Sequence, residues 1–127
     1  MQTQSILTSK FLKVYKNWQT VQKNIPKINR YSLGIKIDTY FVHILEMINY
    51  AQFGERKFIY LEKGVIQNNI LKSLLSVLFE IGSISEEKYL EICKDLEEIG
   101  KMLYSWKLKV KNKTTHQNLT NGNKKSI

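Results

Sequence analysis

The chain has 127 residues, of which 43% are hydrophobic, and it carries a formal net charge of +9. This length suits one domain with a core of ordinary size. The longest apolar-rich stretch, residues 70–81, is interrupted by polar side chains and is shorter than the roughly 20 residues that span a bilayer. The composition therefore predicts no transmembrane helix.

Apolar residues at helical spacing predict a first helix over residues 9–24 and a second over 30–53. In the first, apolar side chains alternate at intervals of 3 and 4, the register of helices that pack lengthwise in bundles. Pro26 separates the two helices. The apolar positions are Phe11, Val14, Trp18, Val21 and Ile25 in the first helix and Leu33, Ile37, Tyr40, Ile44, Met47 and Ala51 in the second.

A third helix is predicted over residues 56–81 and a fourth over 85–109. Gly54 lies at the break before the third helix, and Gly82 suits the left-handed position that ends it. Ser85 is the predicted N-cap of the fourth helix. The apolar positions are Leu61, Val65, Leu71, Leu75 and Leu78 in the third helix and Tyr89, Ile92, Leu96, Ile99, Leu103, Trp106 and Val110 in the fourth.

Four helices with short connections predict an all-α fold, an antiparallel up-down-up-down four-helix bundle formed by residues 1–110. After Val110 the chain consists mainly of Lys, Asn, Thr, Gln and Ser. Such a composition buries too little apolar surface to offset the entropy lost on ordering. Residues 111–127 are therefore predicted to form a disordered basic tail.

The positive charge is concentrated in the two terminal parts of the sequence. Residues 1–37 carry +7, residues 38–98 carry −5 and residues 99–127 carry +7, which together give the net +9. Neither terminal part contains an Asp or a Glu. Concentrated positive charge gives the long-range, salt-sensitive attraction that phosphate backbones exploit.

A basic stripe is predicted on the outward face of the first helix, because Lys13, Lys16 and Lys23 fall opposite its apolar positions. The candidate nucleic-acid-binding residues are Lys13, Lys16, Lys23, Lys27, Arg30, Lys36, Arg56, Lys57, Lys72, Lys107, Lys109 and Lys111. A Lys-rich surface also keeps a small protein in solution, and this simpler interpretation stays open.

A catalytic site is not expected. His43 and Glu46 share a helix face, but the chain has no Glu-x-x-His unit of the kind that di-iron bundles use. His43 is interpreted as a half-buried helix residue, and Cys93, the single cysteine, as a packing residue. There is no Gly-rich phosphate loop and no nucleophile motif. We therefore expect a protein that is not an enzyme and that holds no cofactor or metal.

The second and third helices carry more apolar residues than one bundle seam uses. The additional positions are Phe41, Val42, Leu45 and Ile48 in the second helix and Phe58, Ile66, Ile70, Leu74, Val77 and Phe79 in the third. Such a surplus suggests a second interface and hence an oligomer. Tyr31, Tyr50, Tyr60 and Tyr104 suit either packing at such an interface or stacking on bases, and packing is favoured because no periodic basic-aromatic pairing accompanies them.

Three short motifs carry a resemblance. Residues 25–34 have the sequence IPKINRYSLG, residues 84–85 are IS, and residues 98–106 have the sequence EIGKMLYSW. They resemble, in order and helical place, the Pro-x-x-x-Arg-x-x-Leu-Gly signature, the helix-four start and the Glu-Ile-Gly-Arg-Met-Leu-Gly-Gly-Trp closing motif of the accessory variability determinant proteins of diversity-generating retroelements. The resemblance extends from about Tyr15 to Lys107.

This resemblance implies a basic homopentamer of four-helix bundles that binds nucleic acid and associates with the reverse transcriptase of the element. That enzyme copies a template-repeat RNA with errors at adenines. The resemblance also gives Arg30 a role as a phosphate or partner contact, whereas the structural alternative is an ion pair with an acid at the same end of the bundle, Glu80, Glu86 or Glu87.

The chain departs from the family pattern at several positions. Lys72 and Ser76 stand where the family often has arginines, and Tyr104-Ser105 replaces the Gly-Gly pair. A sister group, encoded within intervening sequences of large ribosomal RNA genes, carries a Pro-Ser-Asn-Ile-Ala-Glu-Gly-type segment on helix two. Residues 49–54 of this chain are NYAQFG instead, which favours the retroelement branch.

The sequence therefore predicts an oligomeric accessory protein that binds RNA or DNA, associates with a reverse transcriptase and supports mutagenic cDNA synthesis from a template RNA. The alternative is a scaffold that binds only protein. One cysteine and an N-terminus without the apolar core of a secretory signal suggest a cytoplasmic setting.

Overall fold

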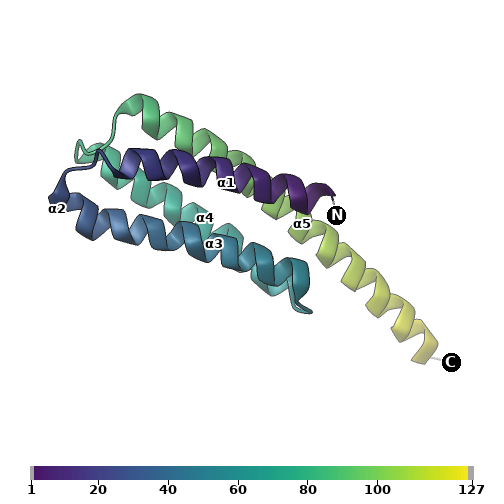
Figure 1. Cartoon of the computed structure of the whole chain (residues 1–127). Helices are drawn as coiled ribbons and strands as arrows, with labels where there is room; N and C mark the ends of the chain where they lie inside the picture. Colours follow the sequence, from purple (N-terminus) through teal and green to yellow (C-terminus); the bar gives the residue numbers. More distant parts are fainter. Residues whose placement is uncertain (1, 126–127) are drawn as a thin grey trace.

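The computed structural model describes the backbone of residues 2–125 and the side chains of residues 6–113. The elements are α1 (Gln2–Gln22), α2 (Lys27–Asn29), the π-helical turn η1 (Arg30–Gly34), α3 (Ile35–Phe53), α4 (Lys57–Glu80) and α5 (Glu86–Lys125). The four long helices run alternately in opposite directions, and each packs against two neighbours (Figure 1). The described backbone contains no strand. The predicted all-α four-helix bundle is confirmed.

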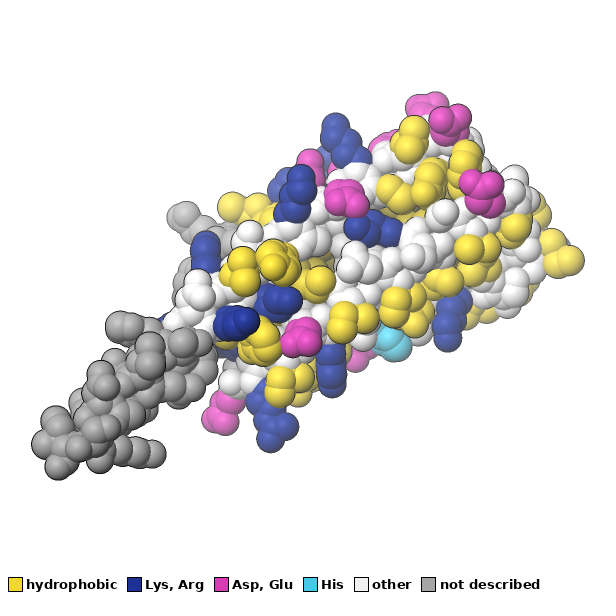
Figure 2. All heavy atoms as spheres, turned by 180° about the vertical axis from the view of Figure 1, so that it is seen from behind, with side chains coloured by type: hydrophobic (Ala, Val, Ile, Leu, Met, Phe, Trp, Pro, Cys, Tyr) yellow, Lys and Arg dark blue, Asp and Glu magenta, His cyan; other side chains and the backbone are white. Residues whose placement is uncertain are grey.

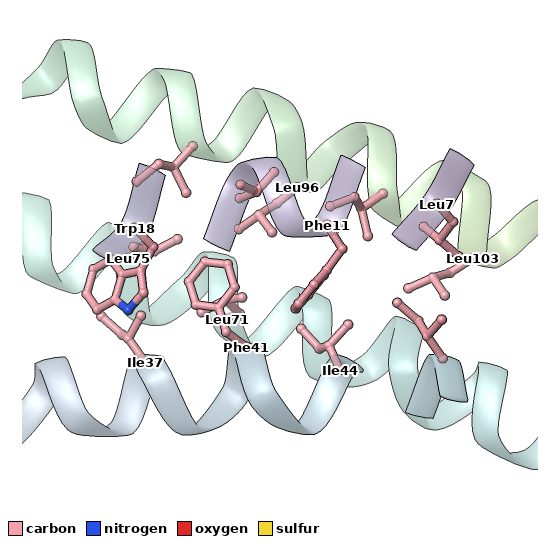
Figure 3. Close-up of a cluster of buried hydrophobic side chains, with 14 of the residues drawn as sticks. Leu7, Phe11, Trp18, Ile37, Phe41, Ile44, Leu71, Leu75, Leu96 and Leu103 are labelled. Atoms are coloured by element: carbon pink, nitrogen blue, oxygen red, sulfur yellow. The ribbon is translucent and has the colours of Figure 1, made fainter. Parts of the chain in front are cut away.

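Each long helix turns one narrow face to the core, and buried positions recur along it at intervals of 3 and 4. Figure 3 shows core side chains of the four helices pointing toward one another. They include Leu7, Phe11 and Trp18 of α1, Ile37, Phe41 and Ile44 of α3, Leu71 and Leu75 of α4, and Leu96 and Leu103 of α5. All five apolar positions predicted for the first helix are buried.

The core differs from the sequence prediction in α3 and α4, and the predicted seam residues Tyr40 and Met47 of α3 are only partly buried. The sequence assigns Phe41 and Ile48 to the surplus apolar surface, whereas both are fully buried. Gly64 and Asn68 occupy buried positions of α4, although neither is hydrophobic. Apolar periodicity does not include such residues, so the prediction of the buried face of α4 lacked both.

The turn between α4 and α5 has the predicted chemistry. Gly82 has a φ of 79°, the left-handed conformation that glycine adopts without steric cost. The N–H groups of Gly82 and Ser83 donate to carbonyls of the last turn of α4 at 2.9 and 3.0 Å, as in a Schellman C-cap. Ser85 Oγ accepts a hydrogen bond from the Lys88 N–H at 3.2 Å, which confirms Ser85 as the N-cap of α5.

The junction between α1 and α3 is less regular than predicted. Instead of starting at residue 30, the helical backbone begins with α2 directly after Pro26 and passes through η1. The Pro26 carbonyl accepts hydrogen bonds from the N–H groups of Asn29 and Arg30, both at 2.9 Å. Gly34 is buried at the end of η1, where a Cβ atom would lie 3.3 Å from the Asn29 carbonyl oxygen. Glycine therefore lets this wide turn pack closely.

The C-terminal end corrects the sequence prediction. α5 does not end near residue 109, because its backbone is helical to Lys125 and projects beyond the bundle (Figure 1). Residues 110–125 contain no Pro, the residue that opposes a helix most strongly. α5 thus continues, as far as Lys125, into the segment predicted to be a disordered tail, and the disorder itself stays a prediction. Residues 126–127 lie outside the described chain.

Candidate nucleic-acid interface

Side-chain contacts on two sides of α1 determine which face of the helix is exposed to solvent. Toward α5, Lys10 Nζ donates to Glu98 Oε2 at 2.9 Å, and Asn17 Nδ2 donates to Glu91 Oε1 at 3.1 Å. Toward α3, three side chains of α1 converge on the Asp38 carboxylate. The face between these flanks, opposite the core, is left to solvent.

Lys13 and Lys16 of the predicted basic stripe lie on that outward face. Lys23 follows in the turn, because α1 ends at Gln22 and not at residue 24 as predicted. Lys13, Lys16 and Lys23 are exposed, and none of their ammonium groups has an ion pair or hydrogen bond within the described part of the chain. Glu98 pairs with Lys10 instead. The hydrogen bond and charge of Lys10 lower the pKa of Glu98, and Lys13 makes only a minor contribution to this shift. The stripe is thus a row of cations available to an anionic partner.

Asp38 holds the opposite flank of α1. Its Oδ1 accepts hydrogen bonds from Tyr15 Oη at 2.9 Å, Trp18 Nε1 at 3.3 Å and Gln19 Nε2 at 3.3 Å. Burial raises the pKa of Tyr15 and the bond to Asp38 raises it further, so Tyr15 remains a donor. Sequence reasoning missed this cluster. A signal was present, because the indole N–H of a buried Trp18 needs an acceptor.

Arg30 is engaged by the end of α1. Its Nη2 donates to the Lys23 carbonyl at 2.8 Å and to the Ile25 carbonyl at 2.9 Å, and its Nε donates to Ile25 at 3.1 Å. These carbonyls lie at a helix C-terminus, where unpaired acceptors favour a cation. The described residues contain no ion pair of Arg30. The structural alternative was therefore wrong about an acidic partner, because backbone carbonyls take that place.

Replacing Arg30 with Ala is expected to lower the free energy of unfolding by about 1–2 kcal/mol, because carbonyls that the guanidinium satisfies lose a charged donor. Arg30→Lys should recover only part of this loss, since lysine lacks the planar fork of donors. Arg56→Ala is a suitable control, because Arg56 is exposed and its side chain makes no hydrogen bond in the described chain. Thermal melting measures the effect. Unchanged melting with reduced RNA affinity would instead assign Arg30 to the nucleic-acid contact.

The basic candidates beside Arg30 stay exposed. Lys27 and Lys36 both face solvent, and Lys36 Nζ lies 5.9 Å from the centre of the Tyr40 ring. Asn29 Nδ2 donates to Ser83 Oγ at 2.6 Å and so ties α2 to the α4–α5 turn. The acidic first turn of α5 follows that turn, so this end of the bundle carries both signs of charge.

A second group of candidates gathers at the opposite end of the bundle. The start of α1, the α3–α4 turn and the part of α5 that leaves the bundle meet there (Figure 1). Arg56, Lys109 and Lys111 are exposed, while Lys57 and Lys107 are half-buried. The ammonium of Lys107 lies 4.8 Å from the centre of the Tyr104 ring, a cation–π distance.

Lys72 belongs to neither group. Its ammonium hydrogen-bonds Glu97 at 2.7 Å and links α4 to α5, and its side chain is only 22% exposed. This hydrogen bond and the charge of Lys72 lower the pKa of Glu97. Among the predicted binding residues, Lys72 and Arg30 are therefore the two whose side chains make hydrogen bonds within the described chain.

Exposed apolar side chains form a row along α4. Ile59, Ile66, Ile70 and Val77 recur at intervals of 7, 4 and 7, and each is between 37% and 52% exposed. This spacing keeps the row on one face of the helix. Figure 2, which views the bundle from behind, shows hydrophobic side chains along the length of this face. We call these four residues the α4 stripe.

A second exposed apolar group lies on η1 and α3. Tyr31, Ile35, Val42 and Phe53 are 66%, 51%, 40% and 86% exposed. The sequence assigned only Val42 to the surplus surface and weighed Tyr31 separately. The bundle therefore presents apolar side chains on two different helices.

The remaining residues considered as reactive groups or metal ligands are His43 and Cys93. His43 is exposed, not half-buried as expected, and its ring lies 6.2 Å from that of Tyr40. Cys93 is partly buried, and burial raises the pKa of its thiol. Within residues that the structure describes, no three His, Cys, Asp or Glu side chains gather as metal ligands. None of the helices so described is long and apolar enough to cross a membrane.

Comparisons with known proteins give information on the fold only. No model of a protein family matches the chain, and no curated protein does. Among solved structures, a protein of unknown function from the S23 ribosomal protein family of Bacteroides thetaiotaomicron has a TM-score of 0.73 at 20% sequence identity, over 83% of this chain and 97% of that one. At this identity the likeness shows the fold alone.

Proposed function

We propose that this protein is a basic, oligomeric nucleic-acid-binding protein of the cytoplasm and that it is not itself an enzyme. The observation that carries the proposal is the outward face of α1. Lys13 and Lys16 on this face and Lys23 directly after α1 make no hydrogen bond to an acid in the described chain, and they lie inside a stretch of 37 residues that contains no Asp or Glu. Positive charge that local acids do not neutralise attracts phosphate backbones.

The finer proposal is that the protein serves a reverse transcriptase. Its support is the resemblance of residues 25–34, 84–85 and 98–106 to the accessory proteins of diversity-generating retroelements. In that role the protein binds the template RNA and the reverse transcriptase and supports mutagenic cDNA synthesis. A reverse-transcriptase gene and an imperfect repeat are then expected next to its own gene.

Reconstituted cDNA synthesis tests this role. The neighbouring reverse transcriptase and its template RNA are incubated with and without the protein, and the cDNA is sequenced. The proposal expects cDNA yield and adenine-directed errors to depend on the protein. Equal yield and equal error frequency in both reactions would refute the accessory role while leaving nucleic-acid binding to be judged separately.

We also propose a closed homo-oligomer. A ring requires two different faces that meet across each contact, and the α4 stripe and the exposed Ile35 and Val42 of α3 supply two such faces. Five subunits follow from the family resemblance. Light scattering should then give a mass about five times the 15.0 kDa of the chain. A monomer at tens of micromolar protein would contradict the oligomer.

A scaffold that binds only protein is the second candidate function. The observation that favours it is the internal use of Arg30 and Lys72, which removes two of the predicted phosphate contacts. On this view the remaining charge serves solubility or an acidic protein partner. The scaffold predicts oligomers with no affinity for RNA or DNA, which the binding experiments below can detect.

A further inference from the structure

Tyr31 differs from the other tyrosines that the sequence left open between packing and base stacking. Tyr50 and Tyr60 contact each other, with ring centres 4.9 Å apart. The Tyr104 ring makes a cation–π contact with the Lys107 ammonium. Tyr31 is 66% exposed, and its side chain makes no ring contact or hydrogen bond within the described chain. Its ring is therefore open to an external partner.

The backbone holds this ring on a rigid turn. Tyr31 lies in η1, and such π-helical turns are frequent at functional sites. The hydrogen bonds of Arg30 tie this turn to the end of α1, and Ser32 Oγ donates to the Ile28 carbonyl at 2.9 Å. A ring on a braced turn loses little conformational freedom when a ligand stacks on it.

Two exposed lysines, Lys23 and Lys27, precede the same turn in the chain. Lys27 precedes Tyr31 by four residues, the spacing of neighbours on one helical face, and it is exposed. The carbonyl of Lys23 is bonded to Arg30, which places that lysine beside the turn. An exposed aromatic ring among cations is the arrangement with which proteins hold single-stranded nucleic acid, because lysines follow the phosphates while the ring stacks on a base.

Resting on the proposed nucleic-acid function, we propose that Tyr31 is a stacking platform for an unpaired base and that the protein prefers single strands to duplexes at this end. A paired base keeps its faces inside the helix stack, whereas an unpaired base offers a face to the ring. Lys23 and Lys27 hold the flanking phosphates. Arg30 is a positioning residue, because its donors hold the turn.

The test uses the intact protein and three probes of equal length, oligo(dT), an abasic oligodeoxynucleotide and a DNA duplex, with oligo(U) as the RNA arm. Fluorescence anisotropy gives each affinity. Wild type should bind oligo(dT) about tenfold more tightly than the abasic strand, which has the same phosphates but no bases. Tyr31→Ala should remove this difference and Tyr31→Phe should keep it, because phenylalanine retains the ring.

Salt dependence separates stacking from charge. Tyr31→Ala should lower the affinity for oligo(dT) without changing the slope of log affinity against log salt, whereas Lys27→Gln should make that slope shallower by about 0.7 for a single strand. Phe53→Ala is the matched control, because Phe53 is an exposed ring at the other end of α3. Its affinities should equal those of wild type.

Three results would overturn the inference. Full retention of the base-dependent affinity in Tyr31→Ala would show that bases are read elsewhere, and equal loss in Phe53→Ala would show that no platform is specific to Tyr31. A smaller oligomer mass in Tyr31→Ala, measured by light scattering, would make the ring a subunit contact. If wild type binds none of the probes, the proposed function itself fails, which is distinct from these outcomes.

Discussion

Replacing Lys13, Lys16 and Lys23 together with Glu is expected to weaken RNA or DNA binding by about two orders of magnitude near physiological salt. All three side chains are exposed, Lys13 and Lys16 on the outward face of α1 and Lys23 directly after it, and none makes a hydrogen bond to an acid in the described chain. Each lost phosphate contact removes its share of counterion release, and each new carboxylate repels the backbone. Because the positions contribute nothing to the core, circular dichroism should show unchanged helix content.

A control with the same change in net charge isolates the position of the stripe. Lys63, Lys94 and Lys101 are also exposed, and none is a predicted binding residue. Their joint replacement with Glu should weaken binding far less. Equal loss in both triple variants would show that only total charge matters, and no loss in either would place the phosphate site on another surface.

Gly100→Ala is expected to lower the free energy of unfolding by about 1–3 kcal/mol. A Cβ atom at this position would lie 2.9 Å from Asn68 Nδ2. Asn68 cannot move aside, because it is fully buried and its Nδ2 donates to the Leu96 carbonyl at 2.9 Å. In an open helix the same substitution would stabilise by roughly 1 kcal/mol, so the sign of the effect is informative. Urea unfolding measures it.

Removing the obstructing side chain should reverse that sign. In an Asn68→Ala background the space beside Gly100 is free, so adding Gly100→Ala should be neutral or stabilising. Wild type, the two single variants and the double variant form a double-mutant cycle. The expected coupling energy is stabilising and offsets the loss in free energy of unfolding that Gly100→Ala causes alone. Additive effects would mean that the cost of Gly100→Ala does not come from the Asn68 side chain.

The sequence predicted the parts of the fold that depend on local chemistry. Gly82 and Ser85 mark the α4–α5 turn because a left-handed position and an N-cap each require particular residue types, and both assignments are confirmed. The end of α5 was predicted too early, because a polar composition lowers helix stability but does not stop a helix as Pro does.

Packing determined what the sequence could not. Helix α3 has apolar residues on several faces, and only its neighbours decide that Phe41 is buried while Val42 stays exposed. The buried Asn68 side chain donates a hydrogen bond to a backbone carbonyl, and the Arg30 side chain also donates to backbone carbonyls. Carbonyl acceptors have no signature in the sequence, since every residue has one.

The candidate site was predicted in part. Helical periodicity placed Lys13 and Lys16 opposite the apolar face, and their exposure agrees with that placement. Lys72 was included from charge alone, and its partial burial beside Glu97 depends on how α4 faces α5. The exposed ring of Tyr31 depends on the π-helical turn, which shifts the register of the following residues.

The affinity of the intact protein for single-stranded RNA, measured over a series of salt concentrations, tests the central claim that the bundle binds nucleic acid through its basic surface. Each phosphate contact with a single strand contributes about −0.7 to the slope of log affinity against log salt. If Lys13, Lys16 and Lys23 each hold one phosphate, the slope should be about −2 or steeper. An absence of binding at low salt, or an affinity that does not change with salt, would contradict the claim and favour the protein-only scaffold.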